Sequence, residues 1–170
     1  SAILPDGDSL SGNQLLYNGR VWRDLYISVK EDQFLFSYEF LPGTVTIEGK
    51  LFSDLKLRYD ILNDEILTIT DHGLILQLNK EMVDNFTMTY NSRTYQFSNL
   101  LTSFSDNLSG YINVRYQGKS ALYIKFKKEI SKVSSGKSYE NFMQFDQMYI
   151  IHDNIPKRLK NKKDLKVLLA

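Results

Sequence analysis

The chain has 170 residues, which suits one domain, and no cysteine, which excludes disulfides, thiolate nucleophiles and cysteine zinc sites. Its 13% aromatic share favours strands, and no apolar run approaches the roughly 20 residues of a membrane span. The formal net charge of +1 hides an asymmetry, because residues 1–85 carry 14 acids and 7 bases whereas residues 86–170 carry 6 and 14, which predicts either an oriented charged surface or acidic strands beside basic strands.

Four short stretches share one order of residue types: an apolar residue, a polar residue, a Gly, Ser or similar small residue, and a base. They are Tyr17-Asn18-Gly19-Arg20, Ile47-Glu48-Gly49-Lys50, Tyr90-Asn91-Ser92-Arg93 and Tyr116-Gln117-Gly118-Lys119. Two-residue hairpin loops need positive φ at their central positions, which Gly and Asn accept at low cost. The repetition therefore predicts tight hairpins and a meander of antiparallel strands.

The N-terminal quarter begins with an aperiodic segment, residues 1–13, which we expect to be an extended lead-in. Gln14–Tyr17 and Arg20–Val29 are predicted to form the first hairpin. Gln33–Leu41 alternates aromatic and other side chains, which strongly predicts a strand, and Pro42-Gly43 is expected to end it.

In the middle of the chain, alternating Leu55, Leu57 and Tyr59 predict a half-buried strand. Turns are expected at Asn63-Asp64 and at residues 71–73, and residues 98–109 are expected to be a loop. The strands predicted around these turns are Thr44–Ile47, Lys50–Phe52, Ile66–Ile69, Leu74–Leu78, Phe86–Tyr90 and Arg93–Phe97.

The C-terminal third holds a fourth hairpin, and residues 129–139 are predicted to be an exposed connection. The expected strands are Tyr111–Tyr116, Ser120–Lys127, Phe142–Phe145, Met148–Ile151 and Ile155–Arg158, the last two joined by a turn at Asp153-Asn154. Asn161 can cap a helix whose first turn carries Asp164, so a short helix is expected from about Lys162.

Together these elements predict an all-β fold, an antiparallel meander of roughly ten to twelve strands spaced about 8–12 residues apart, forming a barrel or a sandwich. A short C-terminal α-helix completes it. The expected organisation is a lead-in at 1–13, a single β domain at 14–160, and a helix at 161–170 that packs on the domain or on a partner.

The side chains that usually carry catalysis are sparse. His72 and His152 are the only histidines, both at predicted turns, and neither a nucleophile elbow nor a spaced metal motif is present. Glycosidase chemistry needs two carboxylates facing one cleft, which neighbours in a turn such as Asp64-Glu65 are not expected to supply. We therefore predict no catalytic residue, no metal and no cofactor.

The densest charge run lies near the C-terminus and contains Lys157, Arg158, Lys160, Lys162 and Lys163. It is either a solvated basic edge or a docking site for an acidic partner or an anionic surface. Nucleic acid is not expected as a partner, because a pI of about 7.8 is low for that class.

Five aromatic side chains are candidates to line a ligand space if the barrel is open inside: Trp22, Phe34, Phe36, Phe40 and Tyr59. In that case the protein would be a lipocalin-like carrier of a small apolar ligand. For Trp22, packing in the core is the alternative.

Several stretches resemble a known group of proteins: Gly49–Ile61, Asp64–Leu67, Gly110-Tyr111, Met148–Ile151 and Lys162–Leu165. The chain resembles small extracytoplasmic β-rich proteins of Bacteroidetes, most of unknown function. The resemblance implies removal of a signal peptide, with Ser1 near a mature N-terminus, and a location in the periplasm or at the outer membrane. It also implies that Asp8-Ser9-Leu10 matches an O-glycosylation pattern of that phylum, with Ser9 as acceptor.

These observations favour a non-catalytic protein-interaction module of the bacterial cell envelope. It would be an accessory subunit of an outer-membrane-associated assembly, such as a secretion-channel accessory or plug. The expected partner is another envelope protein, in the first place an outer-membrane protein. The lipocalin-like carrier is the alternative.

Overall fold

The computed structural model describes residues 14–27, 29, 31–105, 108–132, 140–160 and 163, and among them it shows one antiparallel sheet of eleven strands. The all-β prediction is confirmed. The strands are β1 Arg20–Val21, β2 Leu41–Ile47, β3 Lys50–Asp60, β4 Glu65–Ile69, β5 Ile75–Gln77, β6 Val83–Tyr90, β7 Arg93–Ser105, β8 Leu108–Gln117, β9 Ser120–Lys132, β10 Glu140–His152 and β11 Ile155–Leu159. A 3-10 turn, η1 (Lys80–Met82), precedes β6.

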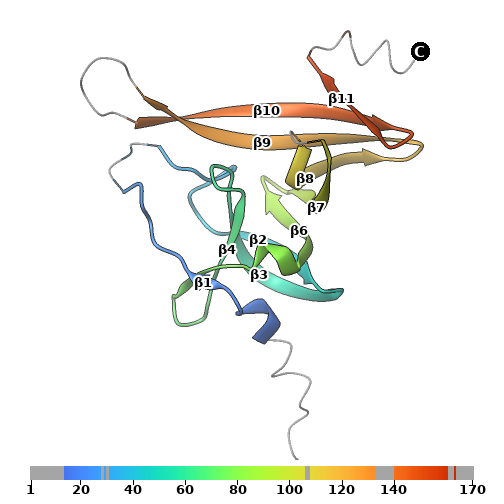
Figure 1. Cartoon of the computed structure of the whole chain (residues 1–170). Helices are drawn as coiled ribbons and strands as arrows, with labels where there is room; N and C mark the ends of the chain where they lie inside the picture. The colour runs from blue at the N-terminus through green and yellow to red at the C-terminus, as the bar shows by residue number, and fades with distance from the viewer. Residues whose placement is uncertain are drawn as a thin grey trace, which may run out of the picture.

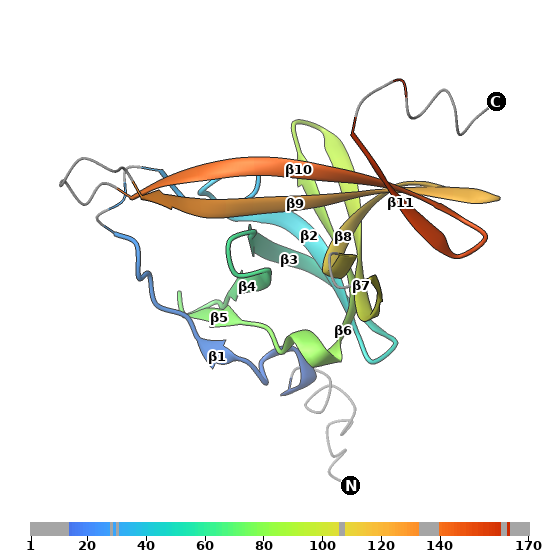
Figure 2. The same ribbon diagram turned by 45° about the horizontal axis from the view of Figure 1, so that its top comes forward.

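The sheet runs in the order β1-β5-β4-β3-β2-β6-β7-β8-β9-β10-β11 and is strongly curled (Figures 1 and 2). The two end strands, β1 and β11, do not pair with each other, so the sheet is not closed into a barrel, and the described strands form one sheet rather than the two of a sandwich. The predicted barrel or sandwich is therefore wrong. β1 and β11 lie at opposite sides of the molecule in both ribbon views (Figures 1 and 2), too far apart to share a ladder. Among the described strands, β1 and β11 therefore each leave one sheet edge unpaired.

Three of the predicted hairpin turns are confirmed by positive φ at both central residues. These are Glu48-Gly49 (φ 48° and 79°), Asn91-Ser92 (49° and 62°) and Asp153-Asn154 (50° and 62°). Positive φ at both positions matches the twist of the flanking strands. The turn between β8 and β9 is also present but lies one residue later than predicted, at Gly118 and Lys119.

The first predicted hairpin is wrong. Gln14–Leu16 forms a single helical turn, and β1 pairs with β5 through Arg20↔Gln77. Gly19 is required here for another reason than turn geometry, because a Cβ on it would lie 2.0 Å from the backbone oxygen of Gln77. The small residue permits close approach of two backbones rather than a tight turn.

The strand predicted at Gln33–Leu41 is also wrong. Between residues 33 and 40 only Phe34 makes a bridge, to Asp60, and Phe36 has a φ of 68°; Leu41 already belongs to β2. The guanidinium carbon of Arg58 lies 4.0 Å from the ring centroid of Phe40, 4.4 Å from that of Tyr38 and 5.2 Å from that of Phe34. The aromatic pattern that resembled a strand serves cation–π packing around one arginine instead.

Other boundaries differ because strands continue through residues that usually end them. β2 runs through Pro42-Gly43, with a register shift between Gly43 and Val45 that accommodates the break. The loop predicted at 98–109 is largely strand, since β7 and β8 extend through most of it. Likewise the two strands predicted between 142 and 151 are one strand, β10.

The predicted helix at 161–170 lies outside the described residues except for Lys163, and the lead-in at 1–13 lies outside them entirely. Helical structure in the described part is limited to η1, the turn at Gln14–Leu16 and Lys163. Within that part, no helix combines the length and the apolar character needed to cross a membrane.

The main core lies on the concave side of the curled sheet and is dominated by aromatic rings. Phe86 and Phe97 stack with centroids 4.5 Å apart, and Tyr59 meets both rings edge-on. The last residues of β3 are buried on both faces, because Arg58 and Asp60 are 7% and 1% exposed. The half-buried prediction therefore fails at this end of β3.

The long ribbon formed by β9 and β10 crosses above the rest of the sheet in both ribbon views (Figures 1 and 2). The β8–β9 ladder begins at Gln117↔Ala121 and stops at Asn113↔Ile124. Beyond that point the turn between β3 and β4 enters the gap, and the amide of Lys128 donates to the oxygen of Ile61 at 3.1 Å. This split between β8 and β9 positions the site described next.

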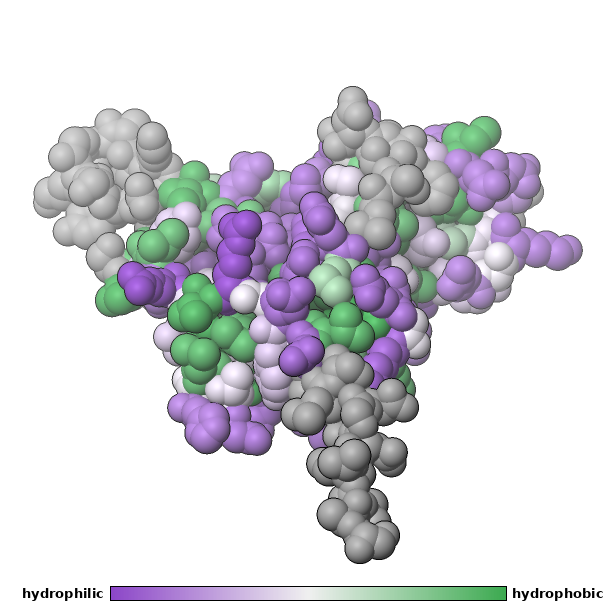
Figure 3. Space-filling view, turned by 60° about the horizontal axis from the view of Figure 1, so that its bottom comes forward, coloured by the Kyte–Doolittle hydropathy of each residue, from purple (hydrophilic) through white to green (hydrophobic). Residues whose placement is uncertain are grey.

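The face turned forward in Figure 3 carries hydrophobic side chains in separate patches among hydrophilic ones. A folded surface normally retains such apolar area.

Candidate functional site

The turn from β3 to β4 is shaped by Asp60. Its carboxylate accepts the amides of Leu62 and Asn63 at 3.0 Å each and the side-chain amide of Gln33 at 2.9 Å. A short acidic side chain that binds backbone amides further along is a standard way to stabilise a turn. The turn ends at Asp64, whose φ is 57°, and this directs the Asp64 side chain into the gap between β8 and β9.

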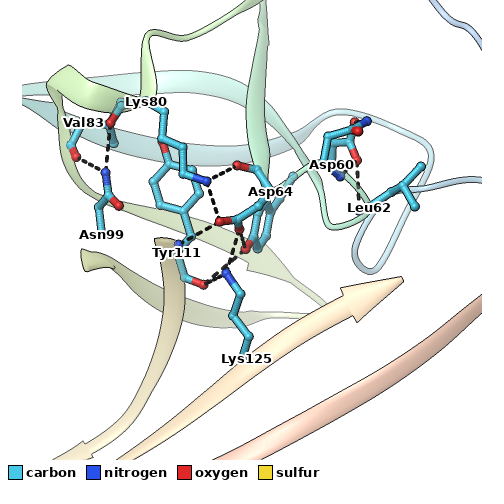
Figure 4. Close-up of polar contacts among 10 residues, drawn as sticks. Asp60, Leu62, Asp64, Lys80, Val83, Asn99, Tyr111 and Lys125 are labelled. Carbon is cyan, nitrogen blue, oxygen red and sulfur yellow. Dashed lines mark hydrogen bonds and ion pairs between the residues drawn. The ribbon is translucent and has the colours of Figure 1, made fainter. Parts of the chain in front are cut away.

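The carboxylate of Asp64 is the centre of a polar cluster (Figure 4). Its Oδ2 accepts the ammonium of Lys80 at 2.6 Å and the amide of Tyr111 at 3.2 Å. Its Oδ1 accepts the hydroxyl of Tyr59 at 2.5 Å and lies 2.9 Å from the ammonium of Lys125. The carboxylate thus binds groups from η1, β3, β8 and β9.

The cluster replaces the part of the β8–β9 ladder that is missing. Asp64 takes the amide of Tyr111, and Lys125 donates to the backbone oxygen of the same residue at 2.7 Å. Buried backbone groups need partners, and here two side chains supply them. We call Asp64, Lys80, Lys125, Tyr59 and Tyr111 the Asp64 cluster.

The electrostatics of the cluster keep Asp64 ionised. Burial by itself raises the pKa of the Asp64 carboxyl, but Lys125, Lys80 and the hydrogen bonds outweigh it and hold that pKa below its usual value. Burial lowers the pKa of Lys125 and raises that of Tyr59. An ionised carboxylate that already binds four donors is not available as a base or a nucleophile. The Asp64 cluster therefore has a structural role, in which it joins β3, η1, β8 and β9.

Beside the Asp64 cluster lies a half-open cleft of about 820 Å³. Its lining is polar, with an arginine, a lysine, three acids and four amide side chains around it. The lining residues include Asn18, Arg20, Asp64, Glu65, Gln77, Asn79, Lys80, Glu81 and Asn99. The expectation that Asp64 and Glu65 would not share a cleft is therefore wrong.

Glu65 is the group in this cleft that can exchange a proton near neutrality. Burial raises the pKa of Glu65 to about 7, with Asp64 and Asp60 adding to the rise and Lys80 and Arg20 opposing it. Its Oε2 is buried without a hydrogen-bond partner, and so is Oδ1 of Asn99 on the same cleft. Paired acids with separated pKa values can serve as acid and base, but here Asp64 is already bound by donors.

We expect Glu65→Gln to stabilise the protein at about pH 8 by about 1–2 kcal/mol, a value discounted for partial exposure. The pKa of folded Glu65 lies above its ordinary value of 4.5, so the folded state holds the proton more tightly. Its burial costs nothing below about pH 4.5, and the cost grows as the pH rises through about 7. Urea unfolding at about pH 5 and pH 8 measures this; an equal effect of the substitution at both pH values would contradict it.

The described residues contain no group of three or more His, Asp or Glu side chains placed to hold a metal ion. His72 is exposed in its turn. His152 is exposed at the end of β10, where its Nδ1 lies 2.8 Å from the Ser120 hydroxyl.

The five predicted ligand-lining residues lie in different surroundings in the described structure. Tyr59 is fully buried in the main core, and Phe36 packs on that core beside Tyr90 and Tyr95. Phe34 and Phe40 contact the guanidinium of Arg58, and Trp22 lies 5.9 Å from Phe34. Tyr59, Phe36 and Phe34 are thus buried or packed on buried residues, and Phe40 packs on an arginine. Trp22, for which core packing was the alternative, is partly buried beside Phe34.

The predicted basic residues lie at the open edge of the sheet. Lys157 and Arg158 are exposed in β11, and Lys160 and Lys163 are exposed beyond it. Neighbouring residues of a strand point to opposite faces, so Lys157 and Arg158 do not share one face. Lys162 and the proposed glycosylation site Ser9 lie outside the described residues.

Comparisons with protein-family models, with curated proteins and with solved structures found no match for this chain.

Proposed function

We propose that the chain is a non-catalytic protein-interaction module of the bacterial cell envelope, an accessory subunit of an outer-membrane-associated assembly. The observation that carries the proposal is the open edge strand β11 with its exposed basic residues. The location in the periplasm or at the outer membrane, and Ser9 as an O-glycosylation site, are supported by the resemblance to extracytoplasmic Bacteroidetes proteins alone.

The β11 strand is suited to binding an extended segment of another protein. It pairs with β10 from Met148↔Leu159 to His152↔Ile155, and no strand is paired with its other edge in the described structure. A free edge presents backbone donors and acceptors to which a partner strand can add. The exposed Ile155, at 69%, supplies an apolar contact at the start of that edge.

The charges around β11 favour an acidic partner. Lys157 and Arg158 point to opposite faces of the strand, so they can flank an added segment on both sides. Complementary charge speeds association and selects the partner, and salt weakens both effects. The non-catalytic part of the proposal is supported by the Asp64 cluster, whose charged groups are engaged by one another.

The carrier alternative has less support. A carrier of an apolar ligand needs an apolar interior space, whereas the described apolar interior is a core of closely packed rings and aliphatic side chains. The cleft beside the Asp64 cluster is lined mainly by polar residues.

We expect the double variant Lys157→Glu/Arg158→Glu to lose the partner. The measurement is a quantitative pull-down from detergent-solubilised membranes of the native organism, at low and moderate salt. The wild type should recover one outer-membrane protein in stoichiometric amount. The reversed charges should weaken its binding at least about tenfold, through like-charge repulsion.

The matched control is Lys50→Glu/Lys56→Glu, which reverses two exposed lysines of β3 away from β11. It should bind like the wild type. Recovery of a lone monomer by the wild type, or equal loss in both double variants, would overturn the proposal.

A further inference from the structure

A second opening in the sheet lies between β7 and β8. It begins beyond Asn113 of β8, whereas the Asp64 cluster contacts β8 at Tyr111. The β7–β8 ladder ends at Phe97↔Asn113. Beyond this pair, Arg93–Gln96 and Val114–Arg115 line a pocket of about 260 Å³. Asn113 bridges the opening, with its side-chain amide donating to the backbone oxygen of Gln96 at 2.9 Å.

Two arginines meet at this pocket on one tyrosine ring. The guanidinium carbon of Arg93 lies 5.1 Å from the ring centroid of Tyr95, and that of Arg115 lies 5.2 Å from it. Within the described chain, neither arginine makes an ion pair with a carboxylate. Two guanidinium charges are therefore gathered without a neutralising anion.

Two polar atoms of the pocket residues also have no partner. Nε of Arg115 is buried without an acceptor, and Oδ1 of Asn113 is buried without a donor on a side chain that is only 1% exposed. Buried polar atoms in folded proteins nearly always have partners, from the protein, from water or from a ligand. The first atom needs an acceptor, such as an oxyanion, and the second needs a donor, such as a hydroxyl.

The surrounding structure holds this arrangement in place. The β8–β9 register shifts between Val114 and Tyr116, which leaves Arg115 without a ladder partner in β9. Such bulges re-aim a side chain. On the other side, the ring of Phe36 lies 4.5 Å from that of Tyr95 and fixes it. A rigid platform of this kind lowers the entropy lost on binding.

We propose that Arg93, Arg115, Tyr95 and Asn113 form a binding site for an oxyanion group that has a hydroxyl beside it, as in a uronic acid or a sugar phosphate. Arginine forks match carboxylate and phosphate oxygens in pairs of hydrogen bonds. The pocket is smaller than the usual range for a drug-sized ligand, so it takes one sugar-sized unit, free or at the end of a chain. The site is independent of the β11 edge.

The test is an NMR titration of the intact chain with glucuronate, with glucose and with inorganic phosphate. Glucuronate should shift the signals of residues 93–96 and 113–115, with saturation at concentrations on the order of 10 mM. Glucose, which has the same ring without the carboxylate, should not. A response to glucuronate but not to phosphate assigns a carboxylate ligand, and a response to phosphate as well assigns a general oxyanion site.

Variants separate the site from nonspecific charge. Arg93→Gln and Arg115→Gln should each weaken glucuronate binding at least about tenfold. Because Arg93 is exposed, its variant keeps the test valid if Arg115→Gln fails to fold. Arg23→Gln, another exposed arginine, should bind like the wild type. An unchanged affinity in Arg93→Gln, or no response of the wild type to either anion, would overturn the proposal.

Discussion

Replacing Asp64 by Ala should lower the free energy of unfolding by about 3–5 kcal/mol, because it leaves buried charge without a partner. The side chain of Lys125 is 5% exposed and would retain only the backbone oxygen of Tyr111 as a partner. The amide of Tyr111 would lose its acceptor, and the hydroxyl of Tyr59 would retain only the backbone oxygen of Tyr111, at 3.4 Å. Urea unfolding at about pH 7 measures the change.

A second substitution tests this explanation. The double variant Asp64→Ala/Lys125→Met should regain a substantial part of the lost stability, because it removes the stranded charge and keeps an apolar stem. Asp71→Ala, at an exposed turn, should change stability by less than about 0.5 kcal/mol. If the double variant lost as much stability as the two single variants lose together, a stranded Lys125 charge would not be the cause of the loss in Asp64→Ala.

Gly110→Ala should lower the free energy of unfolding by about 2–4 kcal/mol, because it strains the backbone and displaces the Asp64 carboxylate. Gly110 has a φ of +72°, which disfavours a side chain. A Cβ there would also lie 2.0 Å from Oδ2 of Asp64 and 3.1 Å from Nζ of Lys80. The carboxylate cannot move aside without losing the donors that hold it.

The matched control is Gly73→Ala. Gly73 has a φ of +79° but open space around the added Cβ, so its substitution should cost only about 1 kcal/mol of strain. In the Asp64→Ala background the cost of Gly110→Ala should fall toward the same value, since the collision is gone. Equal costs of Gly110→Ala in both backgrounds, measured by urea unfolding, would show that Asp64 is not what Gly110 accommodates.

The Asp64 cluster is also connected, through β9 and β10, to the proposed interaction surface on β11. Lys125 belongs to β9, which pairs with β10, which in turn pairs with the open edge strand β11. Asp64 therefore connects the first part of the sheet to the ribbon that carries β11. Asp64→Ala should therefore loosen the β9–β10 ribbon as well as lower the free energy of unfolding. Lys157→Glu/Arg158→Glu should leave the free energy of unfolding unchanged.

Much of the fold followed from local chemistry. Glu48-Gly49, Asn91-Ser92 and Asp153-Asn154 predicted their hairpins correctly, because positive φ depends on the two residues at the turn. The alternating strands beside them were found for a similar reason, since period two is a property of short segments. The confirmed all-β class is the sum of these local signals.

Local signals failed where a segment served a distant partner. The aromatic run at 33–41 alternates like a strand, but Phe40 and Tyr38 pack on Arg58, and Phe36 adopts a positive φ. The stretch at 17–20 resembles a turn, but Gly19 lies against the backbone of Gln77. In both places the requirement came from tertiary packing, which can override a local pattern.

Neither polar site could be located in the sequence. Asp64 was recognised as a turn residue, yet its partners Lys80 and Tyr111 lie 16 and 47 residues further along the chain. Arg93 and Arg115 form a candidate site because both lie by the ring of Tyr95 and neither pairs with a carboxylate of the described residues. The chain alone specifies strands and turns because these are short-range; where the ladders split, and which charges meet there, depends on the curl of the whole sheet.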